Sequence, residues 1–226
     1  MTEQKKVVNI KKDHFIVTFL KENSGILIAL VILCAFLIIN PKTSSSFLTS
    51  KNIFNVLRQI STNLYVACGM LMVIILSGID LSVGSIIALS GCVAAAAVSR
   101  HDLPIFVGML LGLLIGVVVG SVNGLVIAKT TIPPFIVTLA TMNIAKGLAY
   151  VMTGGSPVRV MSKEWQFIGA GYIGSIPTPV IILIFIVLLS WFIMNRTKLG
   201  RHMYAVGDNP QAADRKSTRL NSSHQI

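Results

Sequence analysis

Six long runs of apolar residues, almost free of charged side chains, follow one another along this 226-residue chain. A helix needs roughly 20 apolar residues to cross a bilayer core of ~30 Å, and most of the runs approach that length. Hydrophobic residues make up 54% of the chain and charged residues only 12%, which excludes a disordered chain and disfavours a soluble domain. We therefore expect an all-α polytopic membrane protein with about six transmembrane helices, over residues 25–39, 60–78, 83–98, 103–128, 132–152 and 179–194.

Four regions follow from this pattern. Residues 1–23 form a basic N-terminal tail, residues 24–194 the transmembrane domain, and residues 195–213 a polar segment after the last span. Between the first two spans, Ser46–Gln59 interleaves apolar with polar and basic residues, which predicts an amphipathic stretch at the membrane interface. Residues 214–226 are polar and lack periodicity, so we expect a non-native or disordered tail there.

Positive charge indicates the orientation in the membrane. The formal net charge of +11 comes from Lys and Arg that lie mostly outside the apolar runs, which indicates topology and anionic lipid rather than nucleic acid as the partner. If the N-terminus is cytoplasmic and all six segments cross, more of these residues fall inside than outside. Both the N-terminal tail and residues 195–213 are then cytoplasmic.

One carboxylate interrupts the boundary between the second and third spans. Asp80 lies in the sequence Gly78-Ile79-Asp80-Leu81-Ser82-Val83-Gly84-Ser85, and a charge in a membrane is costly unless it faces water, protein or a helix N-terminus. Asp80 and Ser82 are both residue types that cap helix N-termini. Two interpretations stay open for residues 78–85: a cytoplasmic turn between helices, or a broken helix within the membrane that lines a pathway.

Small and polar residues mark the fourth and fifth spans. A glycine recurs at every fourth position of the fourth span, which predicts a face for close helix packing: Gly108, Gly112, Gly116, Gly120 and Gly124. Asn123 lies near the inner end of that span and could line a cavity. The fifth span carries Thr138, Thr141, Asn143 and Lys146, whose spacing predicts two polar stripes. Interhelical hydrogen bonds or contact with a solute would both explain them.

The chain carries no recognisable enzyme or cofactor motif. It contains neither HExxH nor GxSxG, and it has no Gly-Lys dipeptide, so it has no phosphate-binding P-loop. Its three cysteines are isolated in apolar runs, and its histidines are scattered, so we expect no metal site and no cofactor on this chain. Any ATPase that drives it must be a separate protein.

Four segments in order resemble the permease subunits of ribose-type bacterial ABC sugar importers. They are Phe47–Gln59, the GIDLSVG sequence at 78–84, the region from Asn123 to Leu139, and the run from Thr197 to Ala213. The resemblance covers about residues 25–213. It stops at Ala213, and Asp208 stands where the family usually has a small residue. We therefore expect an N-terminal fragment of a longer permease.

The resemblance implies an ATP-driven sugar importer in the bacterial plasma membrane. Its partners would be a cytoplasmic ATP-binding subunit, a second copy or a sister permease, and an external sugar-binding protein. Residues 195–213 would be the cytoplasmic segment that couples to the ATPase, and the candidates for this role are Gly200, Arg201, Tyr204, Ala205, Gly207, Asn209, Ala212 and Ala213. Pro210, with Asp208 or Asn209 before it, would begin a short helix there.

The polar residues within the spans form a pathway or helix-turn set, namely Asp80, Ser82, Asn123, Thr138, Thr141 and Asn143. A secondary transporter and a non-catalytic membrane scaffold remain as alternatives, because broken helices and polar groups within the membrane suit transporters that need no ATPase. The sequence does not identify the sugar.

Overall fold

The structure is a computed structural model that describes residues 15–208 and contains two compact units, Met1–Asn55 and Val56–Ile226. The first unit contains helices α1 (Phe15–Glu22), α2 (Ser24–Ile39) and α3 (Ser44–Phe47), and the first residues of α4 (Ser50–Ile75). In this unit α1 packs on α2, and α2 on α3. The α2–α3 turn is held by Thr43, whose Oγ1 donates to the Leu37 carbonyl at 2.6 Å. Helix α2 is apolar throughout but has only 16 residues.

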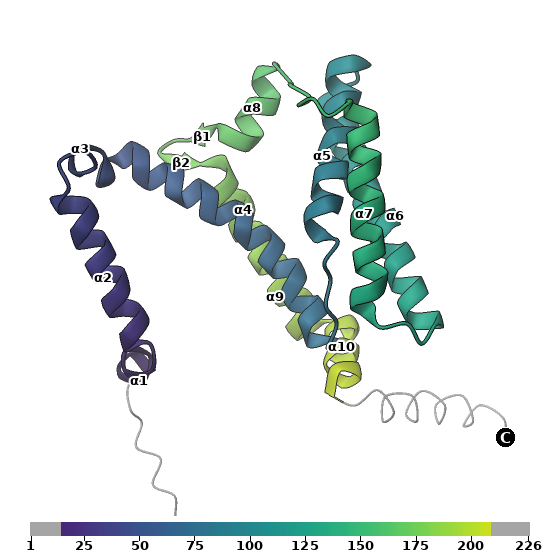
Figure 1. Ribbon diagram of the computed structural model, residues 1–226, viewed down its shortest axis with the longest axis horizontal. Coiled ribbons are helices and arrows are strands. Elements are labelled where there is room, and N and C mark those ends of the chain that lie inside the picture. The colour runs from purple at the N-terminus through teal and green to yellow at the C-terminus, as the bar shows by residue number, and fades with distance from the viewer. Residues whose placement is uncertain (1–14, 209–226) are drawn as a thin grey trace, which may run out of the picture. The chain divides into compact units, whose positions relative to one another are not determined.

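The second unit is built on α5 (Val83–Arg100), α6 (Ile105–Lys129) and α7 (Pro134–Thr153), with α5 packed along both of the other two. These three helices stand side by side in Figure 1, with α5 and α6 antiparallel. Pro134 opens α7 at its first position, and Gly154 ends it in a left-handed conformation (φ 62°). Both features are common at these two ends of a helix.

The close approach of α5 to α6 depends on small side chains. Ala94, Ala95, Ala96 and Ala97 of α5 are all buried, and so are Gly108 and Gly112 of α6. A small cluster of Leu89, Ala145 and Ala149 forms the contact between α5 and α7. In a membrane, large apolar side chains contact lipid as favourably as they contact another helix. Helices therefore associate where small residues allow their backbones to pack closely.

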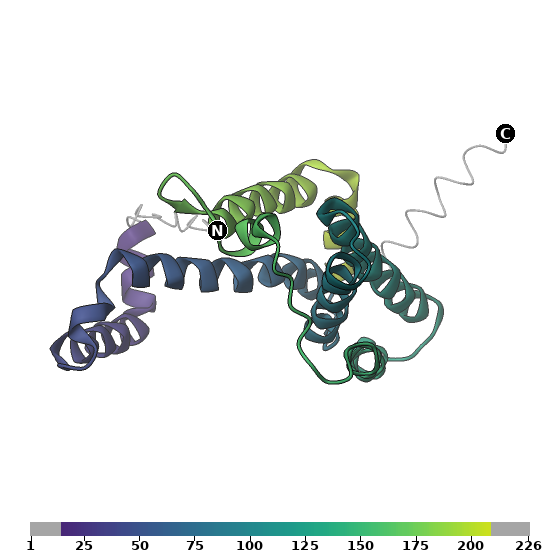
Figure 2. The same cartoon turned by 90° about the horizontal axis from the view of Figure 1, so that it is seen from above.

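After α7 the chain forms a short structure of one helix and a two-stranded hairpin, which we call the capping structure. A long helix follows it. Helix α8 (Lys163–Ala170) begins at Ser162, whose Oγ accepts from the Trp165 amide, and it leads into the hairpin β1 (Tyr172–Ile173) and β2 (Ile176–Pro177). Helix α9 (Thr178–Arg196) then runs back beside α4, and α10 (Lys198–Asp208) follows it at a sharp corner. In Figure 2 α9 runs alongside the later part of α4, and α10 lies near the point where both helices end. We call this end of the second unit, where α6 also ends and α7 begins, the α10 end.

The helices match the expected spans except around the second one. Among the residues that the structure describes, five helices, α4, α5, α6, α7 and α9, are long and apolar enough to cross a membrane, and α2 is a shorter apolar helix. The all-α polytopic fold class is confirmed. The amphipathic stretch expected over Ser46–Gln59 is not a separate segment, because α4 runs unbroken from Ser50 to Ile75 and ends before Gly78. Part of the expected N-terminal tail is also helical, since α1 covers Phe15–Glu22.

Candidate functional site: a polar break between α4 and α5

The chain between α4 and α5 leaves the helix through a well-defined cap. The Gly78 amide donates to the Val73 carbonyl at 3.1 Å, and the Ser77 amide to the Ile74 carbonyl at 2.8 Å. These two bonds form a Schellman motif, with Ser77 at the left-handed position (φ 58°) that glycine usually occupies. The chain then continues without helical structure to Ser82, where α5 begins.

Asp80 anchors the start of α5, but in a different way from that expected. Its Oδ1 accepts from the Ser82 amide at 2.8 Å and from the Ser82 hydroxyl at 2.6 Å. Ser82 occupies the N-cap position with helical backbone angles, and its side chain makes no capping bond. Of these two side chains, the carboxylate of Asp80 satisfies a backbone donor, because the hydroxyl of Ser82 is directed at Asp80.

Asn123 connects this turn to α6 and α7. Its Nδ2 donates to Ser82 Oγ at 3.1 Å, and its Oδ1 accepts from Thr141 Oγ1 at 2.5 Å. Ser82 is fully buried and Asn123 is 5% exposed. A buried amide that finds partners on both sides avoids the cost of desolvating an unpaired polar group, about 1–3 kcal/mol.

Thr138 holds the extended chain from its other side. Its Oγ1 accepts from the Leu81 amide at 3.2 Å and lies 3.2 Å from the Ile79 carbonyl, to which it can donate. The Pro134 carbonyl, one turn back on α7, lies 3.0 Å from the same oxygen. Irregular backbone within a membrane needs such partners, and Thr138 supplies them from a position that is only 2% exposed.

The position of these groups along the helices bears on the two interpretations of residues 78–85. Asn123 lies six residues before the end of α6, which is about 9 Å along the axis, and Thr138 lies four residues after the start of α7, about 6 Å. The break is therefore recessed between α6 and α7 rather than placed beyond their ends. This geometry favours a broken helix over an ordinary connecting turn.

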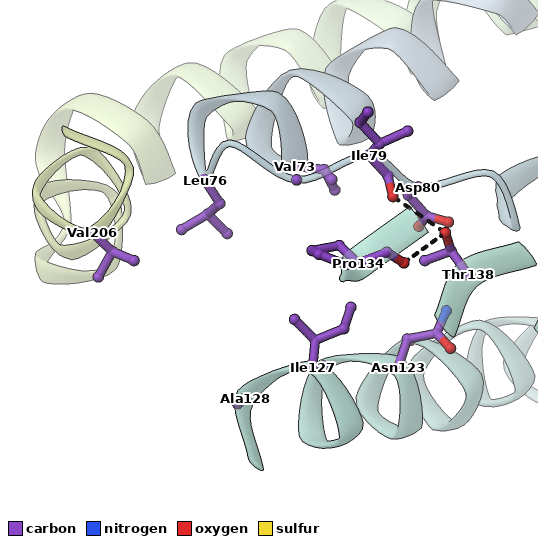
Figure 3. Close-up of a pocket in the computed structure, with 13 residues that line it drawn as sticks. Val73, Leu76, Ile79, Asp80, Asn123, Ile127, Ala128, Pro134, Thr138 and Val206 are labelled. Carbon is purple, nitrogen blue, oxygen red and sulfur yellow. Dashed lines mark hydrogen bonds between the residues drawn. The ribbon is translucent and has the colours of Figure 1, made fainter. Parts of the chain in front are cut away.

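A cavity of about 430 Å³ opens beside the break. Figure 3 shows Asp80, Asn123 and Thr138 along one side of it and apolar side chains around the rest. The apolar part of the lining includes Val73 of α4, Leu76 just after it, Ile127 of α6, Pro134 of α7 and Val206 of α10. We call Asp80, Ser82, Asn123, Thr138 and Thr141 the polar cluster. It brings together five of the six residues predicted for the pathway or helix turn.

The sixth residue, Asn143, lies elsewhere. Its side chain is exposed, and its Nδ2 donates to the Leu139 carbonyl of its own helix at 2.9 Å. Lys146 is exposed as well. The second polar stripe of α7 therefore faces away from the cavity, because Thr138 and Thr141 turn toward α5 and α6 while Asn143 and Lys146 lie on another side of the helix.

The five glycines of α6 have two different surroundings. A Cβ at Gly108 would lie 2.6 Å from Val98 Cγ2, and one at Gly112 would lie 3.2 Å from Ala94 Cβ, so these two permit close packing on α5. A Cβ at Gly116 would make only an ordinary contact with Ser90, and Gly120 and Gly124 have open space around them. Within residues 15–208 the last two line the cavity, so the packing face is shorter than the spacing predicted.

The coupling candidates also divide into two groups. Arg201, Tyr204 and Ala205 are exposed on α10. Gly200 is buried at the corner, where a Cβ would overlap carbonyl groups at the end of α9, and a Cβ at Gly207 would overlap the Ile75 carbonyl. These two glycines serve internal contacts, which sequence spacing alone does not reveal. Asn209, Ala212 and Ala213 lie outside the described residues.

The helix expected to begin near Pro210 lies outside the described residues. Before it, α10 covers Lys198–Asp208, so the part of the segment that the structure describes is helical and includes Asp208. Leu199, Met203 and Val206 recur at helical spacing, and this amphipathic pattern is typical of a helix such as α10.

Several structural contacts have no counterpart in the sequence analysis. The guanidinium of Arg58 donates to the Ala170 carbonyl at 3.2 Å and the Tyr172 hydroxyl at 2.9 Å, and it lies over the Tyr172 ring. Arg100 donates to the Met152 carbonyl at the end of α7. In the described part of the chain no cluster of three His, Cys, Asp or Glu side chains could hold a metal ion.

Five apolar spans around a buried polar break define a multi-pass membrane protein. Residues 52–216 match the family described as the permease component of the branched-chain amino acid transport system, and the chain belongs to this family. The prediction of a transporter component rather than an enzyme is confirmed by this membership.

The chain is also similar to curated sugar permeases. It is 41% identical to the ribose import permease protein RbsC of Bacillus subtilis, over 94% of this chain and 63% of that protein. It is 38% identical to RbsC of Haemophilus influenzae, over 86% of this chain and 60% of that protein. Identity to the D-allose transport system permease protein AlsC of Escherichia coli is 34%, over 94% and 64%.

The predicted resemblance to ribose-type permeases is thereby confirmed. The chain spans less than two thirds of the length of these relatives. No solved structure matches the chain significantly.

Proposed function

We propose that this chain is the permease subunit of an ATP-driven sugar importer in a bacterial plasma membrane. The observation that carries the proposal is the similarity, over most of the chain, to permeases whose names specify ribose, D-allose and galactose import. In this role the permease provides the path for the sugar, and a separate ATPase supplies the energy. A pentose or hexose is the class of solute that these names support.

The N-terminus and the α10 end face the cytoplasm in this proposal. Lys129 ends α6, Arg196 ends α9, and Lys198 and Arg201 lie on α10, and basic residues next to spans favour the cytoplasmic side. The polar cluster then lies near the cytoplasmic side of the membrane. There it forms part of the inner section of the sugar's path, because it supplies buried hydroxyl, amide and carboxylate groups beside a cavity.

The exposed side of α10 is the proposed contact with the ATPase. Arg201, Tyr204 and Ala205 are accessible on a short amphipathic helix that follows the last span. A cationic and aromatic surface of this kind suits a cleft on a soluble partner, since Arg and Tyr are enriched at protein interfaces. The other proposed partners are a second permease copy or a sister permease, an external sugar-binding protein, and membrane lipid.

The test is uptake into proteoliposomes that contain the full-length permease and its ATPase. Radiolabelled ribose, allose and galactose are supplied with the binding protein outside, with ATP or a non-hydrolysable analogue inside. We expect uptake of one of these sugars that requires both ATP hydrolysis and the binding protein. Uptake that continues with the analogue would identify a secondary transporter, and no uptake of any sugar by a correctly assembled complex would contradict the sugar assignment.

A further inference from the structure

We propose that Ser77 and Gly207 are positioning residues through which α10 controls the polar break between α4 and α5. The inference rests on the proposed function, and it names the internal contact by which a movement at the ATPase would reach the sugar's path. Three features of the structure support it. They are the contact itself, the backbone conformation of Ser77, and the cavity that α10 shares with the polar cluster.

Helix α10 touches the rest of the unit at the cap of α4. Ser77 Oγ donates to the Gly207 carbonyl at 3.3 Å. A Cβ at Gly207 would overlap the Ile75 carbonyl and would lie 3.6 Å from the Leu76 Cα, so only glycine allows this approach without a shift. The two segments are 130 residues apart in sequence, and here one turn of α10 meets the last turn of α4.

Ser77 adopts a conformation that a non-glycine residue avoids. Its φ of 58° places it in the left-handed region, where the Cβ crowds the backbone, although it closes the Schellman cap of α4. Such a residue stays in place only when its surroundings hold it there, and the bond to Gly207 is one of those restraints. Withdrawal of α10 would remove it and favour rearrangement of the cap.

A rearrangement of the cap would reach the polar cluster directly. Only Gly78 separates Ser77 from Ile79, whose carbonyl lies 3.2 Å from Thr138 Oγ1, and Asp80 follows at once. An extended chain advances about 3.3 Å per residue, so a displacement at Ser77 has almost no slack to absorb it. Thr138 and Asp80 hold this chain to α7 and to the start of α5.

A movement of α10 would also change the cavity beside the break. Val206, the neighbour of Gly207, lines the same 430 Å³ space as Asp80, Asn123 and Thr138 (Figure 3). When α10 moves, Val206 moves with it, and the cavity changes shape at the same time as the break loses its restraint. One displacement of α10 would thus open or close the inner section of the path.

The test uses the full-length permease, assembled with its ATPase in nanodiscs and supplied with sugar-loaded binding protein. The variants are Gly207→Ala, which places a methyl group on the Ile75 carbonyl, and Ser77→Ala, which removes only the hydroxyl. Gly69→Ala is the matched glycine control on α4, because a Cβ there meets nothing within 4 Å. Ser175→Ala, in the exposed hairpin loop, is the serine control.

We expect both variants to bind the ATPase. Ser77→Ala should melt like the wild type, whereas Gly207→Ala should melt at a lower temperature, because its methyl group must push α10 away from the Ile75 carbonyl. The stimulation of ATP hydrolysis by loaded binding protein should fall about fivefold or more in Gly207→Ala, the scale of a typical coupling between sites. In Ser77→Ala this stimulation should also fall. Ser77→Asn should restore stimulation, because Asn tolerates the left-handed conformation and carries a donor.

Stimulation and uptake at wild-type levels in both Gly207→Ala and Ser77→Ala would overturn the inference, and so would an equal loss in the two controls. If Gly207→Ala fails to assemble, Ser77→Ala and its rescue by Asn decide the matter alone. A wild-type complex that shows no ATP-dependent uptake would instead contradict the proposed function, so the two failures are distinguishable.

Discussion

At the scale of single residues, each member of the polar cluster has a specific partner. Asp80 accepts two bonds from Ser82, Asn123 bridges Ser82 and Thr141, and Thr138 accepts from the Leu81 amide. The cluster thereby cross-links a non-helical segment to two helices. Its stability depends on acceptors and donors being matched, because an unpaired polar group in a buried site is costly.

Replacement of Asp80 should separate hydrogen bonding from charge. Asp80→Ala removes the acceptor of two bonds and should lower the free energy of unfolding by about 1–3 kcal/mol. Asp80→Asn keeps a carbonyl oxygen for the same donors, so its free energy of unfolding should fall markedly less. Thermal unfolding of the full-length permease in nanodiscs measures both. Equal stability of Asp80→Ala and the wild type would show that the carboxylate has no structural role at the break.

Asn123 should matter more than its neighbour Thr141. Asn123→Leu breaks two interhelical bonds, whereas Thr141→Val breaks one, and an interhelical hydrogen bond in a membrane protein contributes about 0.6 kcal/mol on average. Asn123→Leu also leaves Thr141 without its amide partner. In the same unfolding assay, Asn123→Leu should be less stable than Thr141→Val. The reverse order would contradict the bridging role.

At the scale of elements, α6 combines a packing half and a cavity half. Gly108 and Gly112 lie against α5, and Gly120 and Gly124 face open space beside the polar break. Regular spacing therefore indicates where small residues lie on the helix. It does not indicate which of them touch a neighbour, since that depends on where the neighbouring helix crosses.

Two alanine substitutions on α6 distinguish the halves. Gly108→Ala should destabilise the fold by about 1–3 kcal/mol, because its Cβ would lie 2.6 Å from Val98 Cγ2 and 2.9 Å from the Ala94 carbonyl oxygen. Gly120→Ala has no such contact and should be neutral, or stabilising by about 0.5–1 kcal/mol through helix propensity. Chemical denaturation in mixed micelles reports the difference, and equal effects would refute the division.

Much of this element-level picture was accessible from the sequence. Apolar runs located α5, α6, α7 and α9 to within a few residues, because uninterrupted hydrophobic segments leave no other backbone solution in a membrane. The polar residues Asp80, Ser82, Asn123, Thr138 and Thr141 stood out as exceptions in apolar surroundings. Their convergence could not be derived, because it depends on how α6 and α7 pack around α5.

Other features depended on contacts between distant segments. The roles of Ser77 and Gly207 require knowledge that α10 meets the end of α4, 130 residues earlier. The unbroken α4 was missed because Lys51, Asn52, Asn55 and Arg58 suggested an interfacial segment. Helices extend beyond the bilayer core wherever other parts of the protein or the interface accept their polar side chains, as Ala170 and Tyr172 do for Arg58.

At the scale of the whole molecule, the proposed function requires one fixed orientation of the protein in the membrane. The α10 end must face the cytoplasm if α10 is to contact an ATPase, and the capping structure formed by α8 and the hairpin must then face outward. Arg58 holds that structure through the Ala170 carbonyl and Tyr172, so Arg58→Lys should weaken it. Lys cannot reproduce the planar two-partner contact. Faster proteolysis of residues 163–177 in Arg58→Lys, without a change elsewhere, is the expected result.

The most direct test of the central claim uses a single cysteine at position 205. Cys34, Cys68 and Cys92 are first replaced in the full-length permease, and Ala205→Cys is added on the exposed side of α10. A membrane-impermeant thiol reagent should label this cysteine in inverted vesicles but not in intact cells, and bound ATPase should protect it. Labelling from outside intact cells, or equal labelling with and without the ATPase, would contradict the account.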